Sequence, residues 1–154
     1  MSAVELELVV QAAAWGPAKK WEKLFLPAAE AVLAYAQNPA PTAQLCVLLS
    51  DDRRITLHNK QWRGKDKPTN VLSFPSPGIV RQKGFFGDII LSHETIEREA
   101  VEQGKSLFQH ALHLFVHGFL HLLGHDHENE ADAQIMETIE KKILLELGEP
   151  DPYE

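Results

Sequence analysis

Three histidines in the segment 117–127 have the spacing of metal ligands. His117 and His121 are four residues apart, which in a helix places both imidazoles on one face, one turn apart. Gly124 follows, where a glycine can end a helix in the left-handed conformation and let the chain fold back to bring in His127. Three neutral imidazoles leave one coordination position for water, which is typical of catalytic zinc. The pattern predicts one Zn²⁺ per chain, and Ni²⁺ or another transition metal also suits these ligands.

Neighbouring residues offer alternatives to this set. His113 lies one turn before His117 on the same face, and we expect it in the core or beside the ligands. His125 is an alternative to His127 as third ligand, and Asp126 is either an acceptor that orients a ligand imidazole or a solvated turn residue. The other histidines have no partner at ligand spacing and are expected to be structural or surface residues: His58, His93 and His110.

The same spacing occurs in the metzincin peptidases, whose motif is H-E-x-x-H-x-x-G-x-x-H. In that motif the residue after the first histidine is a glutamate, the general base, whereas this chain has Gly118. A zinc peptidase is therefore an alternative that would have to find its base elsewhere.

Positive charge is concentrated in one part of an acidic chain. The net charge is −7, but residues 126–154 alone hold ten acids and two bases. Residues 53–83 hold eight bases and one acid, Asp66. Because charges more than about 8 Å apart are largely screened at physiological salt, such a segment can attract phosphate although the molecule is acidic. The eight bases are Arg53, Arg54, Lys60, Arg63, Lys65, Lys67, Arg81 and Lys83.

Hydrophobic patterning predicts the elements that must position these residues. An almost wholly apolar stretch, 107–123, carries the histidines, and we expect it to be a buried helix opened by Ser106. Pro27 is expected to break or kink the helical pattern of 17–37 into one helix or two, and Ser92 is placed to cap the helix that ends at Gly104. Strands are expected at 4–9, 43–49, 70–74 and 87–91, and helices at 17–37, 51–63, 92–104, 106–123 and 130–147.

Together these elements predict an α+β fold. It would be a single domain over residues 1–154, with a small mixed sheet of about four strands, about five helices and a buried metal-binding helix. The single cysteine, Cys46, excludes an internal disulfide and favours a reducing, cytoplasmic location. The sequence contains no run of about 18 uncharged apolar residues, so neither a signal peptide nor a membrane span is expected.

Two long motifs resemble the bacterial YbeY family. One is the segment from His117 to His127, and the other is Arg63-Gly64-Lys65-Asp66-Lys67-Pro68-Thr69-Asn70-Val71-Leu72-Ser73-Phe74-Pro75. Shorter matches are Gly87-Asp88-Ile89-Ile90, Glu97-Arg98-Glu99-Ala100 and Asp151-Pro152-Tyr153, so that the resemblance covers about 43–153.

The resemblance implies a cytoplasmic, metal-dependent endoribonuclease specific for single strands. It would act in maturation of the 3′ end of small-subunit (16S) rRNA and in ribosome quality control, with ribosomal subunits as partners. The metal, usually zinc, would be held by His117, His121 and His127, and the functionally important arginine would be Arg63. A guanidinium can stabilise the charge that develops on a phosphate during cleavage, while Lys65 and Lys67 would position the RNA backbone. A non-catalytic ribosome-assembly factor with a structural metal remains the second alternative.

Overall fold

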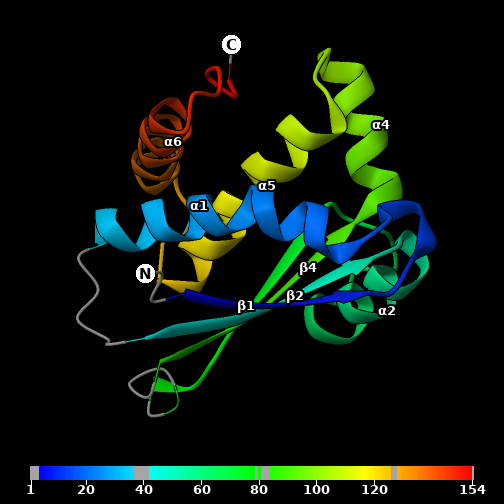
Figure 1. The fold of residues 1–154 in the computed structure, drawn as a ribbon. Helices are drawn as coiled ribbons and strands as arrows, with labels where there is room; N and C mark the ends of the chain where they lie inside the picture. The colour runs from blue at the N-terminus through cyan, green and yellow to red at the C-terminus, as the bar shows by residue number, and fades with distance from the viewer. Residues whose placement is uncertain (1–3, 37–41, 79, 81–83, 126–127, 154) are drawn as a thin grey trace.

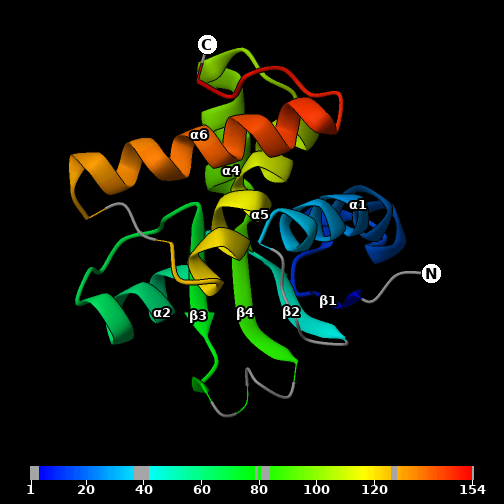
Figure 2. The same ribbon diagram turned by 90° about the vertical axis from the view of Figure 1, so that its left-hand side faces the viewer.

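The computed structural model describes residues 4–36, 42–78, 80, 84–125 and 128–153. Over these residues it contains one four-stranded sheet, five α-helices and a short 3₁₀ helix (Figures 1 and 2). No helix in the described part of the chain is long and apolar enough to cross a bilayer. The elements are β1 (Val4–Val10), η1 (Ala13–Trp15), α1 (Ala18–Ala36), β2 (Ala43–Ser50), α2 (Asp52–Arg63), β3 (Val71–Pro75), β4 (Phe85–Ser92), α4 (His93–Gln103), α5 (Leu107–Leu122) and α6 (Glu130–Glu146).

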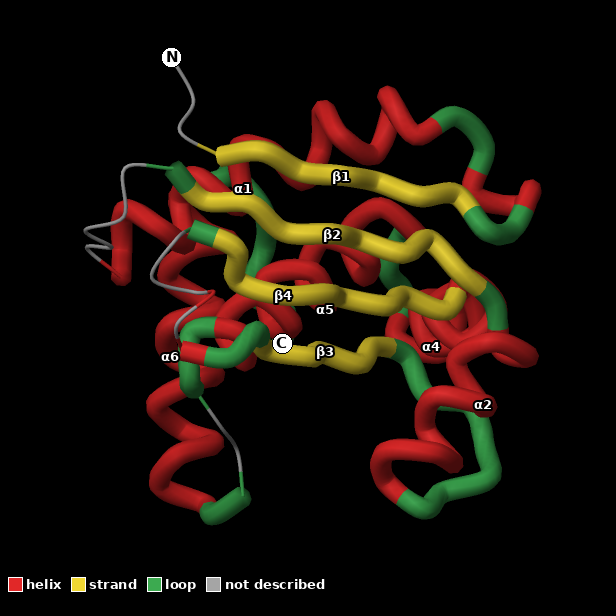
Figure 3. The backbone as a smooth tube through the Cα atoms, turned by 90° about the horizontal axis from the view of Figure 1, so that it is seen from below, coloured by secondary structure: helices red, strands yellow, loops and turns green. Residues whose placement is uncertain are grey.

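The sheet is mixed, as expected. Its strand order is β1-β2-β4-β3, with β1, β2 and β4 parallel to one another (Figure 3). Strand β3 pairs antiparallel with β4 and lies at the edge. The α+β prediction with four strands and five helices is therefore confirmed.

The main core lies between one face of the sheet and the helices α1 and α5. Phe25 of α1 stacks on Phe115 of α5 with ring centroids 4.5 Å apart, and both side chains are fully buried. Helices α4 and α6 also pack on α5, so that most of its sides are covered. This confirms the prediction of a buried central helix, and it makes α5 a rigid support for the histidines.

Helix α2 packs on the opposite face of the sheet. Its Ile55 meets Leu72 of β3 and Ile90 of β4 in a second, smaller core. The helix begins after Asp51, whose side chain accepts a hydrogen bond from the Arg54 amide, and ends at Gly64 in the left-handed conformation. Both ends agree with the prediction.

Helix α1 is a single helix, although Pro27 left open whether this segment would form one helix or two. A proline inside a helix removes one backbone hydrogen bond and costs about 3 kcal/mol. The helix nevertheless runs continuously from Ala18 to Ala36. Its buried face, which includes Trp21, Phe25 and Val32, packs into the main core and outweighs this cost.

The hydroxyl of Ser92 also has a different partner from the one predicted. Ser92 occupies the position before α4, but its side chain makes no capping bond to that helix. It donates instead to Asp52 at the start of α2, at 2.6 Å, and Thr95 donates to the same carboxylate. In return Glu94 accepts from the Asp52 amide. The beginnings of α2 and α4 are thus tied together, because each supplies groups that the other needs.

Candidate metal centre and cleft

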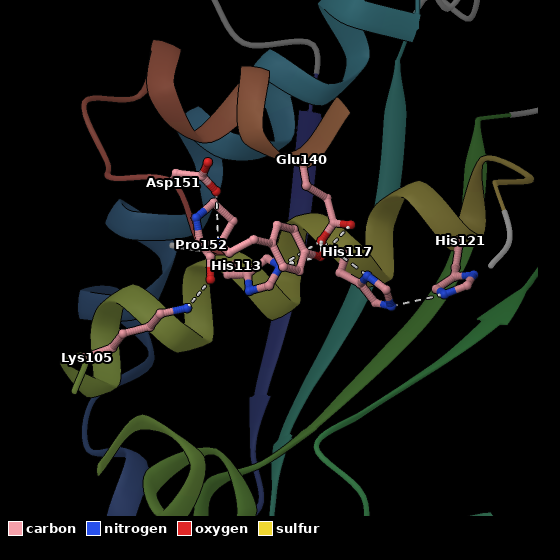
Figure 4. A network of polar contacts seen from close by, with 8 residues as sticks. Lys105, His113, His117, His121, Glu140, Asp151 and Pro152 are labelled. Atoms are coloured by element: carbon pink, nitrogen blue, oxygen red, sulfur yellow. Dashed lines mark hydrogen bonds and ion pairs between the residues drawn. The ribbon is translucent and has the colours of Figure 1, made fainter. Parts of the chain in front are cut away.

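Helix α5 presents His117 and His121 to each other. The helix begins with a capping box formed by Ser106 and Gln109, and Gly124, with φ of 100°, turns the chain away after the last turn. The Nε2 atoms of His117 and His121 are 3.1 Å apart (Figure 4). The predicted pairing on one helix face is confirmed, as is the glycine break.

This arrangement fits a bound transition metal. Two imidazole nitrogens on one tetrahedral zinc at 2.0–2.1 Å lie about 3.3 Å from each other, close to the separation found here. The His117 ring uses Nδ1 to contact Glu140 at 3.2 Å, which leaves Nε2 to face His121. Within the described residues no group of three or more His, Cys, Asp or Glu side chains completes a metal site. His127 and Asp126 lie outside those residues, so the third ligand stays a prediction.

Glu140 of α6 is the buried carboxylate behind the histidines. Its side chain is fully buried, and Oε1 accepts hydrogen bonds from His113 at 2.7 Å and from His117 at 3.2 Å (Figure 4). Burial raises the pKa of this carboxyl group, but the hydrogen bonds from the two histidines outweigh burial and lower the pKa to about 2. An ionised acceptor of this kind fixes the tautomer and orientation of the His117 ring and increases its basicity as a ligand.

Tyr153 completes the environment of Glu140. Its hydroxyl donates to the carboxylate, with distances of 3.1 Å and 3.2 Å to the two oxygens. Burial, and then the neighbouring Glu140 carboxylate, raise the pKa of the Tyr153 phenol. The C-terminal segment that carries Tyr153 is held by Lys105, which donates to the Pro152 carbonyl, and by a 3.2 Å ion pair of Lys141 with Asp151.

Glu140 was missed in the sequence, although the sequence contains a signal for it. The final helix has an apolar stripe that includes Met136, Ile139, Ile143 and Leu144, and most of its acids lie off this stripe. Glu140, however, lies on the stripe itself, between Ile139 and Ile143, and is as buried as they are. A carboxylate at an apolar position of an amphipathic helix needs a partner in the core.

Three further histidines contact carboxylates. His113 contacts Glu140, in agreement with its expected place beside the ligands. His110 is buried and contacts Glu99 at 2.9 Å, and Glu99 also accepts from Asn70 at the start of β3. His93 lies 3.5 Å from Glu97.

His117 and His121 open into a cleft of about 710 Å³. One wall is edge strand β3 with the residues just before it, and another is the end of α5. His125, the alternative ligand, and Glu128 line the cleft as well, and so does Arg63, although it comes from the opposite side of the sheet. The structure thus places Arg63 around the same cleft as the histidine pair.

Arg63 is set in place by the end of α2. Its guanidinium donates to the Asn59 side chain at 3.4 Å. The buried Asn59 in turn donates to the Lys67 carbonyl and so ties the following loop to the helix. Lys65 and Lys67 are exposed on this loop, whereas Arg81 and Lys83 of the basic segment lie outside the described residues.

Gly118 lies at a close approach of α5 to the sheet. A Cβ atom at this position would lie 3.1 Å from Ser73 Oγ and 3.2 Å from methyl groups of Ile89 and Val71. The Ser73 hydroxyl donates to the Gly118 carbonyl at 2.9 Å. The glycine therefore sets the depth at which the histidine helix packs against the wall of the cleft.

Comparisons with known proteins place this chain in one family. The family model described as "Endoribonuclease YbeY" matches residues 11–148. A protein of that name from Rhodopseudomonas palustris (strain BisA53) is 45% identical over 96% of this chain and 88% of its own length. Another from Chelativorans sp. (strain BNC1) is 52% identical over 78% of this chain and 76% of its own.

One solved structure shares the fold. The solution structure of TM1509 from Thermotoga maritima aligns with a TM-score of 0.60 over 97% of this chain and 99% of that one, at 23% identity. The fold follows from this match, and the family follows from the sequence matches. The chain belongs to the endoribonuclease YbeY family.

Proposed function

We propose that this protein is a zinc-dependent endoribonuclease that cuts single-stranded RNA in the cleft between α5 and β3. The observation that carries the proposal is that the His117–His121 pair, oriented by an ionised buried carboxylate, opens into the same cleft as Arg63. His127 is the proposed third ligand. Ni²⁺ or another transition metal remains chemically compatible with three imidazoles.

The residues of the cleft have complementary tasks in phosphodiester cleavage. When bound, a divalent metal supplies Lewis acidity, which polarises a phosphoryl oxygen and makes water more acidic. The Arg63 guanidinium offers paired N–H donors to the phosphate oxygens as negative charge develops on them. Glu140 keeps the His117 ring in place throughout, and the hydrogen bonds that it accepts stabilise its negative charge.

A single strand suits this site better than a duplex. The His117 side chain is only 20% exposed, so a scissile phosphate has to enter the cleft to reach it. A flexible single strand can bend one phosphate inwards, whereas a duplex holds its phosphates on a stiff helix. The exposed lysines of the loop after α2 can hold the backbone on either side of the bent nucleotide.

The cellular role is proposed from the family resemblance of the two motifs. We infer a cytoplasmic protein that matures the 3′ end of small-subunit (16S) rRNA and takes part in ribosome quality control, with ribosomal subunits as partners. The basic residues of α2 and its loop supply the electrostatic attraction for RNA that this role needs.

The test uses a precursor of small-subunit rRNA with an unprocessed 3′ extension. Zinc-loaded protein is incubated with this RNA, with a fully paired duplex of the same sequence, and with casein. We expect cuts in the unpaired extension, none in the duplex and no digestion of casein. Binding without cleavage, under zinc or nickel, would favour the assembly factor, and digestion of casein would favour the peptidase.

A further inference from the structure

Trp62 is the exposed tryptophan of the three in this chain. Trp15 and Trp21 are fully buried in the main core, whereas Trp62, in the last turn of α2, is 64% exposed. Exposing an indole to water forgoes a large hydrophobic gain, so an exposed tryptophan beside a candidate site calls for an explanation.

Two further rings lie next to Trp62 and give it a fixed support. The Phe74 ring of β3 is 6.1 Å from the Trp62 ring, with an angle of 61° between the planes. His58, one turn earlier on α2, lies at the same distance from Phe74. Phe74 is half-buried and belongs to the small core under α2, so it anchors one side of Trp62 and leaves the rest exposed.

The aromatic cluster of His58, Trp62 and Phe74 lies on the α2 side of β3, and the cleft lies on the other side of the same strand. Successive residues of a strand point to opposite faces, so Phe74 faces α2 while Ser73 and Pro75 line the cleft. Because β3 is the edge strand, no further strand of the described residues blocks the path around it. Arg63, the residue after Trp62, lines the cleft and bridges the two sides.

The charges around the cluster match a polyanion. Lys60, Arg63, Lys65 and Lys67 are all exposed on the end of α2 and its loop. Two acids lie nearby: Asp66, whose exposed carboxylate is 3.8 Å from the Lys60 ammonium, and Asp88, which pairs with Phe74 across β3 and β4. An aromatic face surrounded by cations combines the two features by which proteins hold single-stranded nucleic acid: stacking on bases and attraction of phosphates.

We propose that Trp62 is a base-stacking platform for the RNA strand as it leaves the cleft. The indole stacks on an unpaired base while Arg63 contacts the phosphate inside the cleft. Stacking tolerates any base but needs one that is not already paired, so Trp62 is a determinant of single-strand specificity. The inference rests on the proposed function, since it concerns the RNA bound at that cleft.

The experiment compares two 12-residue probes that have the same phosphates. One is fluorescent 2′-O-methyl oligouridylate, and the other is an abasic oligomer of equal length. Affinities of the full-length, zinc-loaded protein are measured by fluorescence anisotropy in one buffer, and gels verify that the probes stay intact. We expect Trp62→Leu to weaken binding of the oligouridylate about tenfold and to change binding of the abasic oligomer less than twofold.

Leu57 provides the matched control. It lies on the same helix with the same 64% exposure but has no ring, so Leu57→Ala should change neither affinity. Trp62→Phe keeps an aromatic face and should retain most of the binding. In the wild type, the oligouridylate should quench the tryptophan emission and the abasic oligomer should not, while Trp62→Leu should show no quenching.

The inference is overturned if Trp62→Leu weakens binding of both probes equally. It is also overturned if the substitution changes the affinity for neither probe. Cleavage of a single-stranded RNA by the same preparations separates this result from the proposed function. RNA cleavage with unchanged oligouridylate binding in Trp62→Leu refutes the platform alone. Base-dependent binding through Trp62 without any cleavage supports the platform and refutes the nuclease.

Discussion

At the scale of single residues, the buried carboxylate of Glu140 controls the orientation of the histidines. It accepts hydrogen bonds from His113, His117 and Tyr153, and these come from two separate parts of the chain. The donors keep it ionised, because they lower its pKa to about 2 although burial raises it. Its charge is therefore present at any pH at which imidazoles can bind metal.

The first prediction concerns the substitution Glu140→Gln. A neutral amide keeps the shape but loses the charge that orients the His117 ring, so zinc affinity should fall about 10- to 100-fold. Competition with a chromophoric chelator measures this affinity. Glu146→Gln, at an exposed position of the same helix, should leave it unchanged. An unchanged zinc affinity in Glu140→Gln would show that the carboxylate serves packing only.

The second prediction separates chemistry from binding at the end of α2. If Arg63 stabilises charge in the transition state, Arg63→Ala should lower kcat for RNA cleavage tenfold or more, about 1.4 kcal/mol, with unchanged metal content. Lys65→Ala should mainly raise KM, because its exposed ammonium holds the backbone in ground state and transition state alike. Steady-state kinetics on one single-stranded substrate decide this. If both variants raise KM alone, Arg63 is a further phosphate anchor.

The pairing of His117 with His121 could be predicted from sequence because their relation is local. Four residues of helix place His117 and His121 together whatever the rest of the chain does, and Gly124 acts on its own turn. Glu140 comes 19 residues after His121, on another helix, and its contact depends on how α6 crosses α5. Local spacing contains no information about that crossing.

At the scale of elements, the anchoring of α2 determines where Arg63 lies. The Asp52 carboxylate at the start of this helix accepts hydrogen bonds from Ser92, Thr95 and Arg98 of the β4–α4 region. Burial raises the pKa of Asp52, but these hydrogen bonds outweigh burial and hold the pKa below its ordinary value.

The third prediction is the pH dependence of this anchor. The pKa of Asp52 is lower in the folded than in the unfolded protein. Its contribution to the free energy of unfolding is therefore fully present above about pH 4 and is lost as the pH falls through the folded-state pKa. Asp52→Asn should reduce the free energy of unfolding by about 1 kcal/mol at pH 7. In urea titrations the difference from the wild type should shrink below pH 4. A difference that stays constant down to pH 3 would mean that the charge is not involved.

The fourth prediction concerns the packing of α5 on the sheet. Gly118→Val places methyl groups where Ser73, Ile89 and Val71 already leave too little room for a Cβ. The substitution should therefore lower the free energy of unfolding by about 1–3 kcal/mol. Glu102→Val, at an exposed position of α4, is the control, since there only helix propensity changes. Equal effects of the two substitutions would contradict the close approach. Gly118→Glu would meet the same steric limit, so restoring the peptidase motif should disturb the helix rather than supply a base.

Most elements could be predicted, and the exceptions have tertiary causes. The four strands and the ends of α2, α4 and α5 follow from apolar patterning and glycines at Gly64, Gly104 and Gly124. Pro27 left open whether one helix or two would form, and the packing of Phe25 on Phe115 favours the single helix α1. Ser92 bonds to Asp52 rather than to its own helix, because the fold brings the starts of α2 and α4 side by side.

At the scale of the whole molecule, the sheet gathers the separate parts of the site. The histidines lie on the α5 side and Arg63 comes from the α2 side, and they meet only because β3 is an edge strand. Figures 1 and 2 show these two helices on opposite faces of the sheet. The protein has a net charge of −7, but the acids of residues 126–154 belong to α6 and its flanking segments rather than to α2. The basic end of α2 can therefore attract RNA, because distant charges are screened by salt.

The central claim is that the histidine centre holds the metal with which RNA is cut. The most direct test measures cleavage of one fluorogenic single-stranded RNA by the purified protein, by the same protein stripped with a chelator, and by stripped protein reloaded with one equivalent of zinc. Metal content is followed by elemental analysis, and circular dichroism verifies the fold. We predict that stripping abolishes cleavage and that zinc restores it, with no recovery in His121→Ala, which lacks a ligand. Undiminished cleavage by folded, metal-free protein would contradict the account.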